Sequence, residues 1–180
     1  ADVTGRRVQN WIYAYYFFVT QPEPAPVPPD FHLRFLNSIA EQVNFLRANL
    51  TAARNHRTLE LYAIFLAGVV FPEFRDAADW RAFALPEIVH NMSTDLLADG
   101  VQCELSTDYH HLVLKNYLCV RRLALANHIA VPRDMDAMLI KALDFSMHAH
   151  NPAGVVPSFS DGDVHGYLDL LLQGCELYGR

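Results

Sequence analysis

The sequence predicts an all-α fold built from antiparallel helix hairpins that stack in an arc or ring. Three observations lead to this class. Apolar residues return every three or four positions over long stretches, and they almost never alternate at every second position, as strands would require. The composition is 52% hydrophobic and 19% charged over 180 residues, which suits one globular domain with its own core. Short polar or proline-containing segments separate the apolar stretches, as in antiparallel helix pairs. We therefore expect about seven or eight helices in a single helical domain over residues 1–180.

The first two predicted helices flank a proline-rich connector. Arg7 to Val19 is rich in aromatic side chains, which need a partner surface to cover them. Residues 21–29 read QPEPAPVPP. Proline lacks the backbone N–H and clashes inside a helix, so we expect an extended connector here. Asp30 is a suitable N-cap for the next helix. That helix has an apolar stripe at three- and four-residue spacing, formed by Leu36, Ile39, Val43, Leu46 and Leu50.

The middle of the chain predicts a buried helix followed by two shorter ones. His56 to Val70 is apolar almost all round, which indicates a helix enclosed by others. Asp76 to Phe83 is a short amphipathic piece. Pro86 is expected to open a separate helix, because proline fits the first helical turn. Gly100 is expected to mark the end of that helix.

The last third of the chain predicts three helices and a long loop. Ser106 or Thr107 is expected to cap a helix that runs to about His128. Pro132 is expected to open the next helix. Residues 151–162 contain two prolines and two glycines and are predicted to form a loop, and residues 164–178 form the last helix.

Charge, cysteines and hydropathy exclude several classes of protein. The net charge of −6 and the lack of a basic run argue against a nucleic-acid partner. The three cysteines, Cys103, Cys119 and Cys175, form no C-x-x-C pair, which argues against a disulfide framework or a zinc site. The longest apolar run, Leu61 to Phe71, is too short to span a bilayer. Aromatic residues follow Arg6-Arg7 with no small-residue cleavage site, so we expect no signal peptide in this stretch. The scattered histidines predict no metal site, and no cofactor motif is present.

Two polar clusters are candidates for chemistry. Residues 54–57, Arg-Asn-His-Arg, lie at the start of the predicted buried helix. They form either a solvated helix terminus or a site for an anion such as a carboxylate, which a helix N-terminus favours. Residues 99–111 contain Glu104, Ser106, Tyr109 and His110 around the start of a later helix. They form either a capping motif followed by a core aromatic, or a site where the tyrosine donates a proton to a leaving oxygen.

Ordered motifs over nearly the whole chain resemble the heparinase II/III-like polysaccharide lyases, including their alginate lyase relatives. The order and spacing of these motifs make the set specific. They are R-x-x-N-W-I at residues 7–12, N-H at 55–56, F-P at 71–72 with Trp80, D-G…E-x-S-x-x-Y-H at 99–110, and a loop similar to P-x-x-G-D-x-D at 157–163, with Ser160 where glycine is usual.

The resemblance implies the fold and surroundings of the chain. The family's helical domain is an incomplete α/α toroid followed by a β-sandwich. This chain is similar to the later part of the toroid, with the first toroid helices expected before Arg6 and the β-sandwich absent. The implied partners are an acidic polysaccharide and the missing C-terminal β-sandwich. The resemblance implies a periplasmic or secreted protein, whereas the lack of a signal peptide leaves the cytoplasm open.

The resemblance also implies β-elimination at a uronic acid. Removing the C5 proton requires that the adjacent carboxylate be neutralised, which stabilises the enolate-like transition state. By resemblance, Asn55 binds that carboxylate with help from His56. Tyr109 protonates the departing O4 and, for one epimer, also removes the C5 proton, whereas His56 is the base for the opposite face. Residues expected to orient Tyr109 or to contact the substrate are Arg54, Glu104, His110 and Asp161.

Two other functions remain open at this point. One is a non-catalytic helical domain that binds acidic glycans, and the other is an all-α interaction scaffold. The family carries a further catalytic histidine in the β-sandwich, so the isolated chain is expected to hold half an active site. The lyase hypothesis predicts that the Asn55 amide, the His56 ring and the Tyr109 hydroxyl converge on one concave surface.

Overall fold

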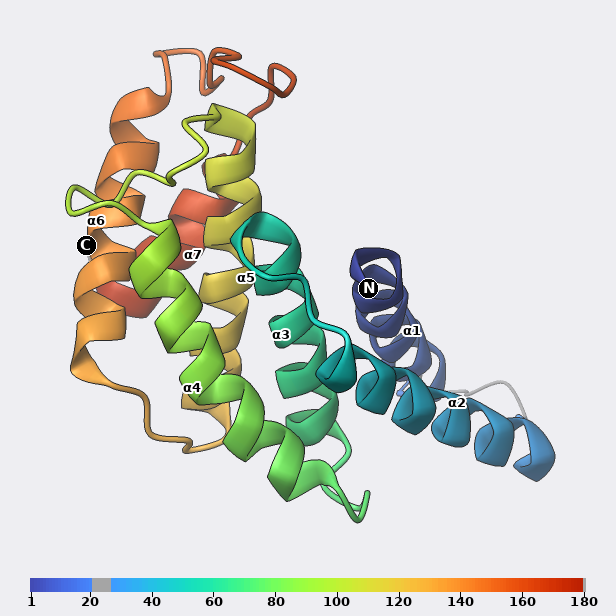
Figure 1. Ribbon diagram of the computed structural model, residues 1–180. Helices are drawn as coiled ribbons and strands as arrows, with labels where there is room; N and C mark the ends of the chain where they lie inside the picture. Colours follow the sequence, from blue (N-terminus) through green and yellow to red (C-terminus); the bar gives the residue numbers. More distant parts are fainter. Residues whose placement is uncertain (21–26, 180) are drawn as a thin grey trace.

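The computed structural model describes residues 1–20 and 27–179, and within these ranges it contains seven helices and no strand (Figure 1). The all-α prediction is confirmed. The helices are α1 (Asp2–Val19), α2 (Pro29–Ala48), α3 (Arg54–Val70), α4 (Ala77–Asp95), α5 (Thr107–Ala126), α6 (Arg133–Ala149) and α7 (Leu168–Tyr178).

Helix α3 is the centre of the packing. It contacts α1, α2, α4 and α5, and every residue from Thr58 to Val69 is buried. The prediction of an enclosed helix is confirmed, because a helix that is apolar all round has to be covered on every side. The neighbouring helices bring the residues that complete this core, among them Val8, Ile12, Ile39, Val43, Trp80, Ile88, Val113 and Leu114.

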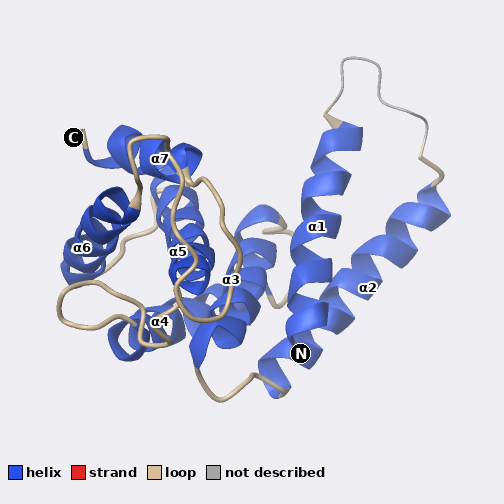
Figure 2. Cartoon of the chain, turned by 90° about the horizontal axis from the view of Figure 1, so that it is seen from above, coloured by secondary structure: helices blue, strands red, loops and turns tan. Residues whose placement is uncertain are grey.

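The remaining helices extend the packing in chain order. Helix α5 packs on α3 and α6, and α7 packs on α5 and α6 (Figure 2). Helices α3 and α4 run in opposite directions, as do α5 and α6 (Figure 1). Helices α3 and α5 both begin at the same end of the molecule, where the loops before α5 and before α7 also lie (Figure 1). The polar clusters predicted from sequence therefore lie at one end of the helix stack.

Helix α4 corrects one prediction. It runs without a break through Pro86, which was expected to open a separate helix. The proline removes the N–H that would bond to the carbonyl of Ala82. Both Pro86 and Ala82 are exposed, so water can satisfy that carbonyl. The helix then ends at Asp95, five residues before Gly100, which occupies a later turn with φ +91°.

Two helix starts also differ from expectation. Helix α2 begins at Pro29 with Pro28 as its N-cap, so Asp30 lies in the first turn and does not cap the helix. Its carboxylate still lies near the positive end of the helix dipole. The predicted connector lies partly outside the described residues, at positions 21–26. Helix α7 begins at Leu168, four residues after the predicted start, because residues 164–167 belong to the loop that crosses the start of α5.

None of the described helices combines the length and apolar character needed to cross a bilayer.

Candidate functional site

The start of α3 is satisfied by carboxylates from other parts of the chain. Its N-cap residue is Ala53, which has no side chain to accept a hydrogen bond. The backbone N–H of Arg54 bonds to Asp95 at the end of α4. The backbone N–H of Asn55 lies 3.4 Å from Oε1 of Glu104, in the loop before α5. Both carboxylates stand at the positive end of the helix dipole, where negative charge is stabilising.

The Asn55 side chain is committed to Glu104. Its amide nitrogen Nδ2 lies 2.9 Å from Oε2 and 3.1 Å from Oε1 of that carboxylate. The neighbouring Arg54 guanidinium contacts the sulfur of Cys103, and Arg54 has a φ of +75°, in the left-handed region that costs energy for a side-chain-bearing residue. Residues 54–55 and 103–104, far apart in sequence, thus form one joined surface.

A buried polar network lies behind this helix start. Oδ2 of Asp95 accepts a hydrogen bond from Nδ2 of Asn91 at 3.0 Å, and the same Nδ2 lies 2.8 Å from Oγ1 of Thr58. The Tyr117 hydroxyl lies 3.3 Å from that Oγ1. All four side chains are buried, and burial raises the pKa of Asp95. Sequence reasoning missed Asp95, although its position four residues after Asn91 on the buried side of α4 was a usable signal.

The start of α5 is capped by its own sequence. Oγ of Ser106 accepts a hydrogen bond from the backbone N–H of Tyr109 at 3.2 Å, so of the two predicted caps, Ser106 and Thr107, the structure uses Ser106. The Ser106 hydroxyl in turn donates to the backbone carbonyl of Asp161. Thr107 donates to the carbonyl of Pro157 at 2.7 Å and accepts from the N–H of Phe159 at 3.1 Å. These bonds therefore hold the loop of residues 157–163 against the first turn of α5.

Tyr109 points away from the apolar core. Its hydroxyl donates to Oδ2 of Asp161 at 3.0 Å in an exposed hydrogen bond. That hydrogen bond and the charge of Asp161 raise the pKa of the Tyr109 phenol, with smaller contributions from Glu104 and Asp108. A tyrosine beside carboxylates keeps its proton at neutral pH. It can therefore act as a hydrogen-bond donor or a general acid.

The two histidines after Tyr109 are buried and serve the fold. Nδ1 of His110 accepts from the N–H of Gln102 at 3.3 Å, and Nε2 lies 3.1 Å from the carbonyl of Ala142. Burial lowers the pKa of His110 to about 4, so the ring is neutral at pH 7. The ring is 1% exposed and leaves no nitrogen for a sugar. Of the two roles expected for His110, contact with the substrate does not fit this burial, and orientation of Tyr109 stays a prediction.

His111 ties the same turn to the loop before α7. Its ring stacks on that of Tyr167 with centroids 4.1 Å apart and bonds to Oγ of Ser146 at 2.7 Å. The Tyr167 hydroxyl donates to Asp108, in the first turn of α5. These contacts fasten the far end of the loop on α5.

The remaining residues of the two predicted polar clusters contact different neighbours around the start of α3. The His56 ring is 50% exposed, and its Nδ1 lies 3.4 Å from the carboxylate of Asp2 on α1. Arg57 pairs with Glu87 on α4 and is not free to bind a ligand. Glu104 bonds to Asn55 and acts through its charge on Tyr109. The structure therefore pairs Asn55 with Glu104 and Tyr109 with Asp161, whereas His56 faces α1.

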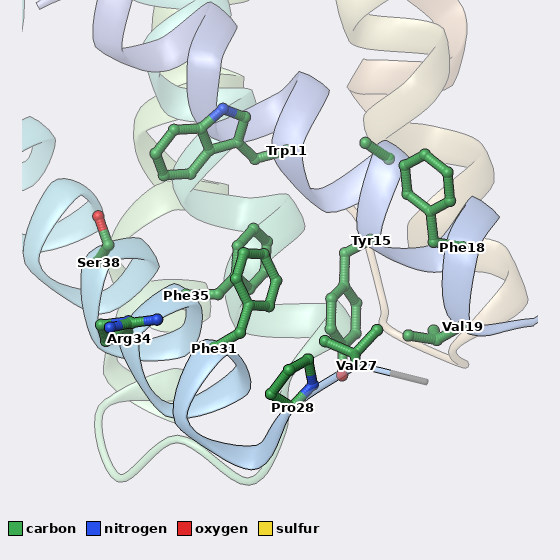
Figure 3. Close-up of a pocket in the computed structure, with 11 residues that line it drawn as sticks. Trp11, Tyr15, Phe18, Val19, Val27, Pro28, Phe31, Arg34, Phe35 and Ser38 are labelled. Carbon is green, nitrogen blue, oxygen red and sulfur yellow. The ribbon is translucent and has the colours of Figure 1, made fainter. Parts of the chain in front are cut away.

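An apolar groove lies elsewhere, between α1 and α2 (Figure 3). It has a volume of about 760 Å³. Trp11, Tyr15 and Phe18 line it from α1, and Phe31 and Phe35 from α2. The aromatic face predicted on the first helix is thus partly covered, since Tyr15 stacks on Phe35 with centroids 5.1 Å apart. The groove carries little polar chemistry and is separate from the linked polar residues.

Comparison with known proteins identifies relatives of the chain. Residues 3–171 match the family model described as the heparinase II/III N-terminus. A heparin-sulfate lyase of Pedobacter heparinus is 30% identical over 161 residues, which cover 86% of this chain and 23% of that relative. The chain thus spans about a quarter of the length of the curated relatives it matches.

Solved structures show the same fold. The crystal structure of heparinase III superposes with a TM-score of 0.87 at 23% identity, over 98% of this chain and 28% of that one. The heparan sulfate lyase HepC from Pedobacter heparinus superposes with a TM-score of 0.68 at 28% identity, over 88% of this chain and 25% of that one. With a family match over nearly the whole chain, the conclusion is that this chain belongs to the heparinase II/III family and corresponds to its N-terminal helical part.

Proposed function

We propose that this chain is the helical part of a polysaccharide lyase that cleaves a uronic-acid-containing polysaccharide by β-elimination. The observation that carries the proposal is the link between two helix starts. Asn55 at the start of α3 donates to Glu104, which lies two residues before the Ser106 cap of α5, and the first turn of α5 presents the phenol of Tyr109 with its proton retained. The relatives named as heparin-sulfate lyases favour a glycosaminoglycan as the substrate.

The proposed reaction needs three events at the sugar. The C5 proton leaves to a base, its electron pair forms the C4–C5 double bond, and the C4–O4 bond breaks. The C5 proton is weakly acidic, because the neighbouring carboxylate opposes further negative charge. A hydrogen-bond donor on that carboxylate stabilises the enolate-like transition state by several kcal/mol. The departing O4 requires a proton from an acid.

Asn55 is the proposed donor to the uronate carboxylate. In the free chain its amide holds the carboxylate of Glu104, a group of the same chemistry as the proposed ligand. The backbone N–H of Asn55 faces the same oxygen from the first turn of α3. The substrate carboxylate takes this position when the Glu104 side chain moves aside. Arg54, in the adjacent position, supplies positive charge.

Tyr109 is the proposed acid. Its hydroxyl is protonated and exposed, so it can give its proton to O4 as the bond breaks. His56 is the proposed base for a substrate whose C5 hydrogen faces away from Tyr109. It lies on the exposed side of the first turn of α3, next to Asn55 in sequence. A polyanionic polymer does not cross a bilayer unaided, so a periplasmic or secreted location is part of the proposal.

Incubation with acidic polysaccharides tests the proposal. The full-length polypeptide that contains these residues is mixed with heparan sulfate, heparin, hyaluronan, chondroitin sulfate and alginate, and the ultraviolet absorbance of the unsaturated uronate is followed. A rise on at least one of them supports the lyase. Saturable binding with no rise on any would replace the proposal with the non-catalytic glycan-binding domain. Neither binding nor a rise would leave the helical interaction scaffold.

A further inference from the structure

The loop of residues 157–163 is fixed by hydroxyl groups of the first turn of α5. Ser106 is 3% exposed and Thr107 is 5% exposed, and both side chains bond to the loop backbone. A buried hydroxyl that lost its partner would be costly, so these bonds hold the loop in one position. The loop is therefore an attached part of the helix start.

The backbone of this loop is shaped to lie close to the helix. Gly162 has a φ of +142°, and a Cβ there would lie 2.4 Å from Cβ of Asp108. Ser160 has a φ of +61°, a left-handed conformation that glycine adopts more easily. The hydroxyl of Ser158 closes the turn by donating to the carbonyl of Gly162 at 2.7 Å. Asp161 lies between these two positive-φ residues.

Asp161 is held to α5 at both its backbone and its side chain. Its carbonyl accepts from Ser106, and its carboxylate accepts from the Tyr109 hydroxyl. Ser106 also accepts the N–H of Tyr109, so one cap residue fixes both partners of the carboxylate–phenol bond. We propose, on the basis of the function proposed above, that Asp161 is a positioning residue that aims the Tyr109 hydroxyl and keeps its proton in place. This replaces the sequence-based expectation that Asp161 contacts the sugar.

The charges around the Tyr109 phenol also determine which proton transfer it can perform. The groups that act on Tyr109 are Asp161 and Asp108 beside it and Glu104 from the loop before α5, and all three are acidic. A phenolate among carboxylates is disfavoured. Tyr109 therefore begins the reaction as an acid and regains its proton readily after donating it. The C5 proton then has to go to another base, such as His56.

Nuclear magnetic resonance can test this without relying on activity. The full-length polypeptide is labelled at the ring carbon that bears the tyrosine hydroxyl, and the Tyr109 signal is assigned by its loss in Tyr109→Phe. Titration with base then gives the midpoint for Tyr109 in wild type, Asp161→Asn and Asp161→Ala. Asp163→Asn is the matched control, because it removes an exposed carboxylate from the same loop. We expect both Asp161 variants to ionise Tyr109 at lower pH than wild type and the control to match wild type.

Kinetics on a cleaved polysaccharide provide the second readout. Asp161→Asn removes the charge but keeps an oxygen that can accept the hydroxyl, so we expect about a tenfold loss of kcat. Asp161→Ala removes both the charge and the acceptor and is expected to lose about a hundredfold. KM changes little in either variant, and the alkaline limb of the pH–rate profile shifts to lower pH in both.

Each contrary result has a definite meaning. An unchanged Tyr109 midpoint in both Asp161 variants overturns the proposal. A raised KM with an unchanged kcat also overturns it, and makes Asp161 a ligand for the sugar. If no acidic polysaccharide is cleaved and the Tyr109 midpoint still falls in both variants, the positioning role stands while the proposed lyase function fails.

Discussion

The starts of α3 and α5 differ in the origin of the groups that satisfy them. Helix α5 is capped by Ser106, the residue directly before it. Helix α3 follows Ala53, which cannot cap, and its first N–H groups bond to Asp95 and Glu104, both more than 40 positions later in the chain. A helix start that already holds carboxylates suits an anionic ligand, because its donors are unmatched by its own sequence. A self-capped start is instead a rigid base that can project a side chain such as Tyr109.

The largest expected effect tests the projected side chain. Tyr109→Phe keeps the ring and the Ser106 cap but removes the proposed acid, so kcat should fall by about 100- to 10,000-fold. The melting temperature should stay near that of wild type, because the hydroxyl bond is exposed. Tyr16→Phe removes a comparable exposed bond, to the carbonyl of Val70 on the far side of the molecule, and should leave kcat unchanged. Wild-type turnover in Tyr109→Phe would remove this residue from the mechanism.

The next prediction tests the external cap of α3. Asp95→Ala leaves the N–H of Arg54 and the amide of Asn91 without their buried acceptor. We expect the free energy of unfolding to fall by about 3 kcal/mol, measured by chemical denaturation. Asp99→Ala is the control, because Asp99 is exposed and bonds only locally to Val101, and it should change stability by less than about 0.5 kcal/mol. Equal losses in the two variants would mean that α3 does not depend on a distant cap.

The start of α5 should show a pH dependence that comes from His110. Burial lowers its folded-state pKa to about 4, below the ordinary value of 6.5. As the pH falls, His110 therefore binds a proton in the unfolded chain before it does so in the folded one. The stability that depends on a neutral His110 is fully present above pH 6.5 and is lost between about pH 6.5 and 4. The full loss corresponds to about 3 kcal/mol. His110→Gln should show a shallower decline over this range, and a decline as steep as in wild type would assign the effect to other groups.

The contrast between the two helix starts also explains what the sequence could predict. Ser106, Tyr109 and the enclosed character of α3 follow from local patterns, and the structure agrees with the predicted cap and the predicted burial. The partnership of Asn55 with Glu104 spans 49 positions, and no local rule links them. The burial of His110 was missed for a related reason, since its partners Gln102 and Ala142 meet only after α6 packs on α5.

The continuity of α4 through Pro86 was missed for a different physical reason. A proline inside a helix removes one hydrogen bond and its ring crowds the carbonyl four residues back, and the first of these costs is smaller where that carbonyl can reach water. The exposure of the Ala82 carbonyl depends on which face of α4 packs on α3. The sequence pattern around Pro86 did not predict that face. Local rules thus predicted the elements better than the contacts between them, and the proposed chemistry depends on the contacts.

Loss of the local cap should have a smaller effect than loss of the distant one. Ser106→Ala removes the bond to the N–H of Tyr109 and the bond to the carbonyl of Asp161. We expect the free energy of unfolding to fall by about 1–2 kcal/mol, as for other N-cap serines. Ser106→Thr keeps a hydroxyl and should recover most of this loss. Amide hydrogen exchange should quicken in residues 157–163, and unchanged exchange there would show that the cap does not hold the loop.

The last prediction concerns a small change of KM, and the direction of that change distinguishes two roles of Glu104. If the Glu104 carboxylate occupies the place that the substrate carboxylate takes, then weakening it as a competitor should improve binding. Glu104→Gln keeps the size of the side chain and removes its charge, so its bond to the Asn55 amide is weaker. We expect KM to fall about three- to tenfold on the cleaved polysaccharide, because a charge-assisted bond no longer has to be broken first. Glu73→Gln removes an exposed carboxylate from the turn after the C-terminal end of α3 and should leave KM as in wild type.

A rise of KM in Glu104→Gln would mean that the carboxylate holds the Asn55 amide in the orientation that the substrate needs. The start of α3 would then resemble the start of α5, with internal groups serving only to position a side chain. A fall would mean that the two starts differ in kind. Helix α3 would keep its donors occupied by a replaceable internal carboxylate until a ligand carboxylate arrives, whereas α5 would keep its donors permanently satisfied and offer only the proton of Tyr109.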